Sequence, residues 1–561
     1  MAARILQYYN TVKYLRPTQI AGQFAKTFIM NSKPMATHYD GPALRRMQTL
    51  VPALDLDARY LSRFSAEEVM NNEITLIGET HALDLASWSV DASPLWRFNL
   101  HYFEYAIALA AKYSNTGDIS YYNKFKELVI SWIAANPAGQ GDGWHPYTIS
   151  MRLPNLFICF DLLEKIFEED TTFKDITIQS IYTQYRILIK RKEIWQLGNH
   201  YFENLKTIII CSLLFNEHEV FNRHINIFLR EVSEEILPDG VHFELSIMYH
   251  KIILEDILRT ASWLRQAGKP QYRELMPVIE KMVSAMASLE KGMGKTPLFN
   301  DSGDGVAKEC SALLLAANEL FGVQPVYSDS FDSSGYHKLY DNNIALMFDA
   351  GTIGPSYMPG HGHCDCLSFE LSVDNKPLFV NSGTYQYQGK YRNYFRTTRA
   401  HNTQMVGDKE QSECWGEHRV ARRVSLVKAD KSAHSITASC SSFSGDKHTR
   451  SVSLKDNILS VMDRTNVKTA ATVHSYLHLV MGVSPVVTRG KLRVLCDTGT
   501  VCDISMHGCS AAIHTDGELA NYAPEFGVLQ RGSAIEFSWP SDSSQHGYEV
   551  NFNVSDGRER Y

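Results

Sequence analysis

The feature that most constrains the fold is a change in the spacing of apolar residues beyond the middle of the chain. Between about Pro94 and Phe321, apolar residues recur every three or four positions in one segment after another, a spacing typical of amphipathic helices. Beyond Ser333 they alternate with polar residues in short runs rich in β-branched side chains, which is typical of strands. We therefore predict a helical region followed by an antiparallel β region, with the boundary between Val323 and Tyr336.

A chain of 561 residues is too long for one hydrophobic core, so at least two domains are expected. Successive paired helices form a bundle, a solenoid or a closed (α/α) toroid, and periodicity alone does not choose among them. The β region reads most simply as a sandwich. We predict a basic, helical N-terminal extension over residues 1–90, a helical domain over 91–325 and a β-sandwich over 335–561.

Charge and cysteine usage exclude several classes of protein. A net charge of -7 argues against a protein that coats nucleic acid, so no nucleic-acid partner is expected. The 10 cysteines include no CxxC pair and are read as buried thiols. No apolar run of membrane-spanning length and no signal peptide is seen, which predicts a cytoplasmic location, with the periplasm as the alternative.

Residues 1–39 contain no acidic side chain but several basic ones among apolar and aromatic residues. Such a segment suits a peripheral contact with an anionic membrane or with an assembly partner. A basic helix packed on its own protein explains the composition equally well.

Three clusters of polar residues have the composition of a reactive site. The first, residues 198–204, opens a helix on which Asn199, His200 and Glu203 share a face, although a capped helix start explains it equally well. The second, residues 239–250, places two His, a Glu and Tyr249 in the first turns of a helix; a lone buried Tyr would be ordinary, but this one is not alone. The third, residues 360–415, carries an HxH pair, a later His and several arginines, which suits a metal ion or an acid and base, or chance among 21 His.

Several motifs follow one another along the chain: WRFNLHYFEY (96–105), GWHPY (143–147) with Ser150 and Arg152, NHYFEN (199–204), SIMYH (246–250), NDSGDG (300–305), GHGHCDCLSFEL (360–371) and RAHNT (399–403). Taken in order, these segments resemble the heparinase II/III-like proteins. Each motif is weak by itself, but their order and co-occurrence are specific, and the resemblance covers most of the chain from Trp96 to about Trp415. The first of them also resembles the branch of that family found among polysaccharide biosynthesis proteins.

This resemblance implies an (α/α) toroid, a C-terminal antiparallel β-sandwich and a cleft between them for an acidic, uronate-containing polysaccharide. The implied reaction is β-elimination, because the C5 hydrogen of a uronate lies beside a carboxyl group and is removed once that carboxylate is neutralised. Such a lyase needs a base, an acid and a group that neutralises charge.

The family's catalytic residues are carried over position by position. Tyr249 matches its catalytic Tyr, for which the resemblance implies the role of general acid and leaves open that of base. Asn199 and His200 match the neutralising Asn or the catalytic His, and His361 matches a sandwich-domain His that faces the cleft. A Tyr with an ordinary pKa of about 10 is mostly protonated at neutral pH. We therefore expect His361, His200 and an arginine cluster to favour its phenolate.

The sequence also offers candidate substrate ligands and two alternative functions. For the arginines among the candidate ligands, ion pairing across the domain interface is the alternative explanation. A glycoside hydrolase that uses paired carboxylates among Glu203, Glu244, Asp301 and Asp304 is the second enzymatic hypothesis. A non-catalytic polysaccharide-binding or assembly factor is the third. The candidate substrate ligands are Glu203, Trp144, Arg152, Arg392, Arg396 and Arg399.

The resemblance also implies a structural metal site, usually zinc. His363 and His401 match two of its ligands, but Asn381 stands where the family places an Asp. An amide oxygen brings no charge, so we expect a weakened zinc site or hydrogen bonds in its place.

Overall fold

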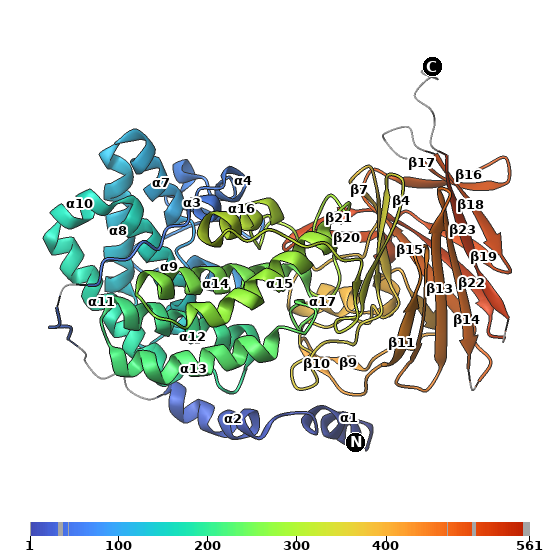
Figure 1. Cartoon of the computed structure of the whole chain (residues 1–561), viewed down its shortest axis with the longest axis horizontal. Helices are drawn as coiled ribbons and strands as arrows, with labels where there is room; N and C mark the ends of the chain where they lie inside the picture. Colours follow the sequence, from blue (N-terminus) through green and yellow to red (C-terminus); the bar gives the residue numbers. More distant parts are fainter. Residues whose placement is uncertain are drawn as a thin grey trace.

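The computed structural model describes residues 2–31, 38–42, 44–467, 469–495, 501–542 and 544–553. Within these ranges a helical region is followed by antiparallel sheets, as the change in periodicity predicts (Figure 1). The helices of the first region are α3 (Pro52–Asp55), α4 (Ala58–Leu61), α5 (Ala66–Met70), α6 (Pro94–Leu100), α7 (Ala106–Thr116), α8 (Ile119–Ala135), α9 (Pro146–Leu162), α10 (Glu164–Glu169), α11 (Thr171–Arg191), α12 (Gly198–Leu214), α13 (His218–Glu235), α14 (Ile247–Gln266), α15 (Tyr272–Glu290) and α16 (Cys310–Phe321).

These helices form two layers. Helices α7, α9, α12, α14 and α16 contact one another in succession, and α8, α11, α13 and α15 lie outside them. In α12, 16 of the 17 residues are buried, whereas α13 buries six of 18 along one face. A helix buried on all sides belongs to an inner layer, and an amphipathic one to an outer layer. This is the two-layer arrangement of an (α/α) toroid.

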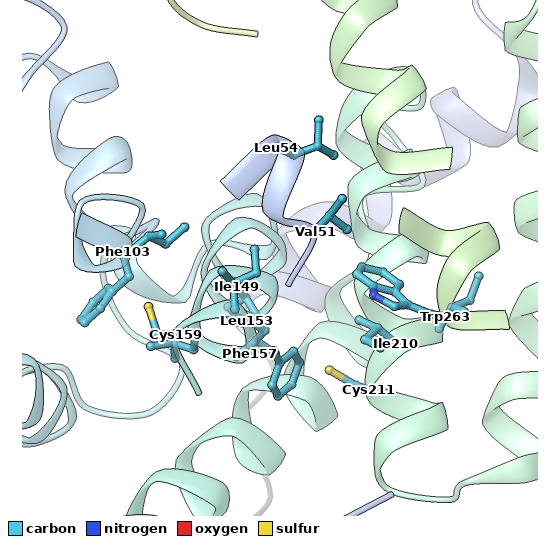
Figure 2. Packing of buried hydrophobic residues seen from close by; sticks show 14 of the residues in the cluster. Val51, Leu54, Phe103, Ile149, Leu153, Phe157, Cys159, Ile210, Cys211 and Trp263 are labelled. Carbon is cyan, nitrogen blue, oxygen red and sulfur yellow. The ribbon is translucent and has the colours of Figure 1, made fainter. Parts of the chain in front are cut away.

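The core of the helical region lies between the two layers and includes buried residues from distant helices. Ile149, Leu153 and Phe157 of α9 face the same core as Ile210 of α12 and Trp263 of α14 (Figure 2). Residues 44–70, which the sequence places in the N-terminal extension, join this region, because α3 contacts α16 and α5 contacts α7. Val51 and Leu54 are buried there. Within the described residues, no helix is both long and apolar enough to cross a bilayer.

The second region is a sandwich of two antiparallel sheets. One has the order β11-β12-β13-β14-β23-β18-β17-β16, and the other has the order β19-β22-β15-β7-β6-β5-β4-β3 with β8 paired to β15. Phe537 of β22 stacks on Tyr548 of β23 at 4.2 Å between ring centroids, so the sheets pack face to face. The strands are β3 (Ser330–Phe331), β4 (Tyr336–Asp341), β5 (Ile344–Asp349), β6 (Phe369–Val373), β7 (Lys376–Phe379), β8 (Gln404–Val406), β11 (Ser425–Lys431), β12 (Ser435–Ser441), β13 (Lys447–Lys455), β14 (Ile458–Asn466), β15 (Thr472–Leu479), β16 (Ser484–Thr488), β17 (Lys491–Leu495), β18 (Val501–His507), β19 (Ser510–His514), β22 (Ser533–Pro540) and β23 (Gln545–Asn553).

Short elements and one apolar cluster join the two regions. Val241 and Leu245, which precede α14, and Ile247, its first residue, pack with Tyr336 of β4 and Met347 of β5. This contact fixes the first turn of α14 against the sandwich. The remaining elements are the N-terminal helices α1 (Ala2–Val12) and α2 (Pro17–Met30), helix α17 (Gly389–Phe395), 3-10 turns at Asp142–Trp144, Thr398–Ala400 and Glu518–Ala520, and the small strand pairs β1 (Glu73–Leu76) with β2 (Glu79–Ala82), β9 (Cys414–Trp415) with β10 (Arg419–Val420), and β20 (Asn521–Glu525) with β21 (Val528–Arg531).

Candidate active site

A cavity of about 1260 Å³ lies between the helical region and the sandwich. Its helical wall carries Asn199, His200, Glu203 and Tyr249, and its sandwich wall carries His361. The structure therefore brings the four residues predicted to be catalytic into one cleft, together with Glu203.

Tyr249 is held at the start of α14 by a helix cap. The Ser246 hydroxyl accepts a hydrogen bond from the Tyr249 backbone N–H at 3.2 Å and donates one to the Asp301 carbonyl at 2.7 Å. The Tyr249 hydroxyl lies 2.8 Å from the hydroxyl of Tyr387, and its ring lies 4.3 Å from the His361 ring between centroids. Contacts from both domains thus fix the orientation of the Tyr249 phenol.

Burial raises the pKa of Tyr249 well above its usual value, and the neighbouring Tyr387, Glu244 and Asp301 raise it further. The expectation that cationic groups favour its phenolate is therefore wrong. The arginines named for that role donate to other groups, and Glu244 and Asp301 act on the phenol instead. Tyr249 rests as a neutral phenol, which is the form that donates a proton.

Asp301 is the centre of a buried polar network behind His361. Its Oδ2 lies 2.8 Å from His361 Nδ1, and its Oδ1 lies 2.8 Å from His363 Nε2. Both oxygens also accept hydrogen bonds from Arg392. Burial alone would raise the pKa of Asp301, but the Arg392 guanidinium and the two imidazoles hold it well below its usual range. A charged Asp301 fixes the ring of His361 toward the cleft.

His200 and Asn199 lie on the opposite wall, in the first turn of α12. His200 is the one residue of α12 that is not buried; its ring stacks on Tyr147 at 4.3 Å, and its Nδ1 lies 3.0 Å from Glu193 Oε1. Burial lowers the pKa of His200, but the Glu193 carboxylate outweighs this and leaves the pKa raised. Asn199 donates a hydrogen bond to the Tyr147 hydroxyl at 3.2 Å. This wall therefore presents an imidazole with a raised pKa and an amide to the cleft.

Most of the residues predicted as substrate ligands do not line this cavity. Arg152 is fully buried and donates to the carbonyls of His101 and Gly143. Arg392 donates to the Asp301 carboxylate, and Arg396 donates to the carbonyls of Gly362 and Glu417. The sequence identified these cations but not their direction, because backbone carbonyls that accept from a buried guanidinium leave no pattern in the sequence.

Of the remaining predicted ligands, one lies in the protein interior, one on the surface outside the cavity and one in the cleft. Trp144 is buried, donates to the Asn136 carbonyl and does not line the cavity. Arg399 is exposed but also lies outside the cavity lining. Glu203 does line it, where its carboxylate is paired with Lys206 at 2.6 Å.

Two further cleft residues escaped the sequence analysis. Tyr387 contacts Tyr249 from a loop 138 residues away in sequence, and the only local signal was the Tyr385 and Tyr387 pair after Gly383. Arg63 lies near the rings of Tyr60 and Phe64, and its Nη1 is buried without a hydrogen-bond partner among the described residues. Burial lowers the pKa of Arg63 to about 10. The sequence places this segment in the N-terminal extension, outside any site.

The residues proposed for zinc provide an incomplete donor set. His363 Nδ1 and His401 Nε2 are buried and lack a hydrogen-bond partner among the described residues, and the two rings lie 5.3 Å apart between centroids. The Asn381 side-chain oxygen instead accepts from Ser368 Oγ at 2.7 Å and lies 3.1 Å from His401 Nδ1. No cluster of three His, Cys, Asp or Glu suited to a metal occurs in the described part of the chain. These residues do not fit a full structural zinc site.

Asn381→Asp is expected to raise the affinity of this position for zinc by at least about tenfold, because it supplies the missing negative donor. We propose that the natural chain binds zinc only weakly here. Equilibrium dialysis followed by metal analysis measures the difference. The double variant Asn381→Asp/His401→Ala is the control and should lose the gain, whereas equal zinc retention by Asn381→Asp and the natural chain would contradict the assignment.

Comparisons with known proteins cover nearly the whole chain. The family described as heparinase II/III N-terminus matches residues 58–327, and the family described as heparinase II/III-like, C-terminal, matches residues 323–547. A heparin-sulfate lyase of Pedobacter heparinus is 24% identical over 344 residues, or 55% of this chain and 51% of that protein. One of Bacteroides stercoris is 23% identical over 429 residues, or 67% of this chain and 62% of that protein. The matched region thus spans about half to three fifths of these relatives.

Solved structures share the fold. A crystal structure of heparinase III superposes with a TM-score of 0.72 at 16% identity, covering 95% of this chain and 90% of that one. The heparan sulfate lyase HepC of Pedobacter heparinus superposes with a TM-score of 0.59 at 17% identity, covering 95% and 88%. A toroid followed by a β-sandwich is therefore the architecture of this chain.

Proposed function

Because this chain belongs to the heparinase II/III-like family, we propose that it is a polysaccharide lyase that cleaves a uronate-containing acidic polysaccharide by β-elimination. The relatives named heparin-sulfate lyase support this activity and point to a glycosaminoglycan-like substrate. The observation that carries the proposal is the contact between Tyr249 and His361 inside the interdomain cleft, opposite His200 and Asn199. An acid, a second proton-transfer group and a cation thus face one space.

In the proposed reaction, His361 accepts the C5 proton and Tyr249 donates its phenolic proton to the departing C4 oxygen. The C5–H and C4–O bonds break and a C4=C5 double bond forms. Since Asp301 lies against Nδ1 of His361, the Nε2 atom, which lies 3.7 Å from Glu244 Oε2, is the nitrogen that acts as base. Afterwards the imidazolium returns a proton to the Tyr249 phenolate, and the packing of the two rings favours this transfer.

Neutralisation of the substrate carboxylate is assigned to His200 and Asn199. The His200 side chain is 34% exposed toward the cleft, whereas Glu193 behind it is 3% exposed and holds its charge. A fixed cation and an amide donor in a partly dry cleft stabilise the charge that develops at the carboxyl group. Arg63, whose Nη1 has no hydrogen-bond partner among the described residues, is a candidate ligand for a second carboxylate or a sulfate of the polysaccharide.

Glu193→Gln is expected to change the pH dependence of substrate binding. The imidazolium form of His200 is present below its pKa, so KM should rise as pH increases through that pKa. Removing the carboxylate that raises the pKa of His200 moves this rise in KM to lower pH. Steady-state KM measured across pH tests this expectation.

Glu536→Gln is the matched control for Glu193→Gln. Glu536 contacts His474 at 2.7 Å and His514 at 2.8 Å on the sandwich, and it does not line the cavity. The KM of Glu536→Gln should vary with pH as that of the natural chain does. If the Glu193→Gln profile also coincided with that of the natural chain, His200 would not be the neutralising cation.

The hydrolase alternative is less well supported, because most of its carboxylates are already paired. Asp301 is bound by Arg392, Glu203 by Lys206, and Asp304 lies 3.4 Å from Lys295. Glu244 lines the cavity without a hydrogen bond to its carboxylate from the described residues, and burial raises its pKa. One such acid does not make the pair that hydrolysis requires.

Product masses separate the three functions. Purified protein is incubated with heparan sulfate, other uronate polysaccharides and capsule or exopolysaccharide of its source, since residues 96–105 resemble the biosynthesis branch of the family. Elimination yields a new end that lacks one water relative to the hydrolysis product, and we expect that mass. A hydrated product would favour the hydrolase, and binding without products would favour a binding or assembly factor.

A further inference from the structure

The first two helices form an arm on the outside of the molecule, here called the N-terminal arm (residues 2–31). In Figure 1, α1 lies beside β9 and β10 of the second region, and α2 lies beside α13 of the first. Its contacts agree, since Tyr8 packs edge-on against Trp415, and Gly22 lies so close to Trp195 that a Cβ atom on it would be 2.9 Å from the Trp195 Cβ. The N-terminal arm therefore bridges both domains.

Apart from Tyr8, the face of the N-terminal arm that touches the protein is mainly polar or small. Thr11 Oγ1 accepts a hydrogen bond from Trp415 Nε1 at 3.0 Å, and Gln19 donates one to the Tyr357 carbonyl at 3.3 Å. Arg16 pairs with Glu234 and stacks on the Tyr357 ring at 3.7 Å. Asn10, Gln19 and Gly22 are the buried residues of these helices. Hydrogen bonds and one ion pair, more than apolar burial, attach the arm.

The outward face of α2 is apolar. Ile20, Phe24 and Phe28 follow at intervals of four residues, so they form one stripe along the helix. Phe24 is 85% exposed and Phe28 is 82% exposed. A surface helix normally buries its apolar face against its own domain and turns its polar face to water. Here the arrangement is inverted.

Helix α1 repeats this inversion. Ile5 is 63% exposed and Tyr9 is 64% exposed, whereas Asn10 is buried. Residues 5 and 9 lie on one side of a helix, since positions four apart adjoin. The two helices thus present a continued series of large apolar side chains to the outside.

The charge of the N-terminal arm has a single sign. Arg4, Lys13 and Lys26 are exposed, and none of them makes a salt bridge with a described residue. No Asp or Glu occurs before Asp40, although the whole chain carries a net charge of -7. A surface that binds the N-terminal arm must therefore be both apolar and negatively charged. The interface of an anionic bilayer has both properties.

We propose that the outward face of the N-terminal arm docks on an anionic lipid surface. Phe24, Phe28, Ile5 and Tyr9 enter the boundary between headgroups and acyl chains, and the basic residues meet the lipid phosphates. Tyr8, Val12 and Gln19 of the same arm line the interdomain cavity, so docking brings one mouth of the cleft to the membrane surface. This inference does not depend on the lyase reaction.

Vesicle sedimentation with the full chain tests the proposal. The natural chain is expected to co-sediment with vesicles of phosphatidylcholine mixed with phosphatidylglycerol, more weakly with phosphatidylcholine alone, and less as salt is added. Phe24→Ser/Phe28→Ser should reduce partitioning by about tenfold or more. Arg4→Gln/Lys13→Gln should remove most of the preference for phosphatidylglycerol.

The control Val326→Ser/Val487→Ser alters side chains that are 76% and 65% exposed outside the arm, and it should bind like the natural chain. Failure to bind either vesicle, or equal binding by Phe24→Ser/Phe28→Ser, would overturn the proposal. Sedimentation velocity without lipid tests whether a second copy of the chain binds this face instead. A self-association that Phe24→Ser/Phe28→Ser abolishes, without vesicle binding by the natural chain, would assign the face to a second copy instead.

Discussion

Tyr249→Phe is expected to lower kcat by about 10²- to 10⁴-fold, the range in which a positioned general acid contributes. The change removes only the hydroxyl that lies 2.8 Å from Tyr387 and keeps the ring that packs on His361. Substrate binding should change little, because the neutralising groups on α12 remain. Steady-state kinetics together with a direct binding measurement gives both values.

Tyr185→Phe is the matched control for this experiment. Tyr185 is fully buried, and its hydroxyl donates to Glu217 at 3.1 Å in the outer layer of the toroid. Its variant should retain kcat within a small factor. A Tyr249→Phe protein that turned over at the natural rate would remove Tyr249 from the mechanism, and an equal loss in both variants would indicate a general effect on folding.

Asp301→Asn is expected to destabilise the fold by about 3–5 kcal/mol, because it leaves the buried guanidinium of Arg392 without its counter-charge. The variant should also lower kcat in the fraction that stays folded, since Asp301 positions His361 for proton transfer. Denaturant unfolding gives the free energy of unfolding, and kinetics below the transition gives the effect on turnover.

The stabilisation by Asp301 has a defined pH dependence. Its pKa is held below the value in the unfolded chain, about 3.9 for an Asp. Its contribution is therefore fully present above that value and is lost as pH falls through the lower folded pKa. The difference in unfolding free energy between the natural chain and Asp301→Asn should consequently shrink on acidification and stay constant near neutrality.

Asp463→Asn provides a comparison inside the same molecule. Asp463 is buried in the sandwich, where Arg450 donates to both of its oxygens at 2.8 Å and His448 Nε2 lies 2.7 Å away. Its loss should destabilise the fold by a similar amount and leave kcat of the folded fraction unchanged. If Asp301→Asn showed the same unchanged kcat, the positioning role of Asp301 would be contradicted.

The fold was predictable because each region has its own apolar period. The periodic segment over 247–266 coincides with α14, and the helix predicted to begin after Gly198 is α12. Alternation is equally plain in β13, where buried and outward residues alternate along its length. The toroid itself rested on the family resemblance, since the same helices could stack as a solenoid.

The sequence predicted the site only in part, because some of its contacts join residues that are far apart in the chain. Tyr249, His361 and the first turn of α12 were identified from local motifs, and the structure places them in one cleft. The contact of Tyr387 with Tyr249 and the direction of Arg152 depend on tertiary packing, which leaves no local pattern. The pKa of Tyr249 was misjudged for the same reason, because burial decides it and burial was unknown.

Elimination by Tyr249 is tested most directly by the ultraviolet absorbance of unsaturated uronide during incubation with a panel of uronate polysaccharides. We expect an absorbance that rises with the natural chain and with Tyr185→Phe and stays flat with Tyr249→Phe. No rise on any polysaccharide that the protein binds, or an equal rise with Tyr249→Phe, would contradict it.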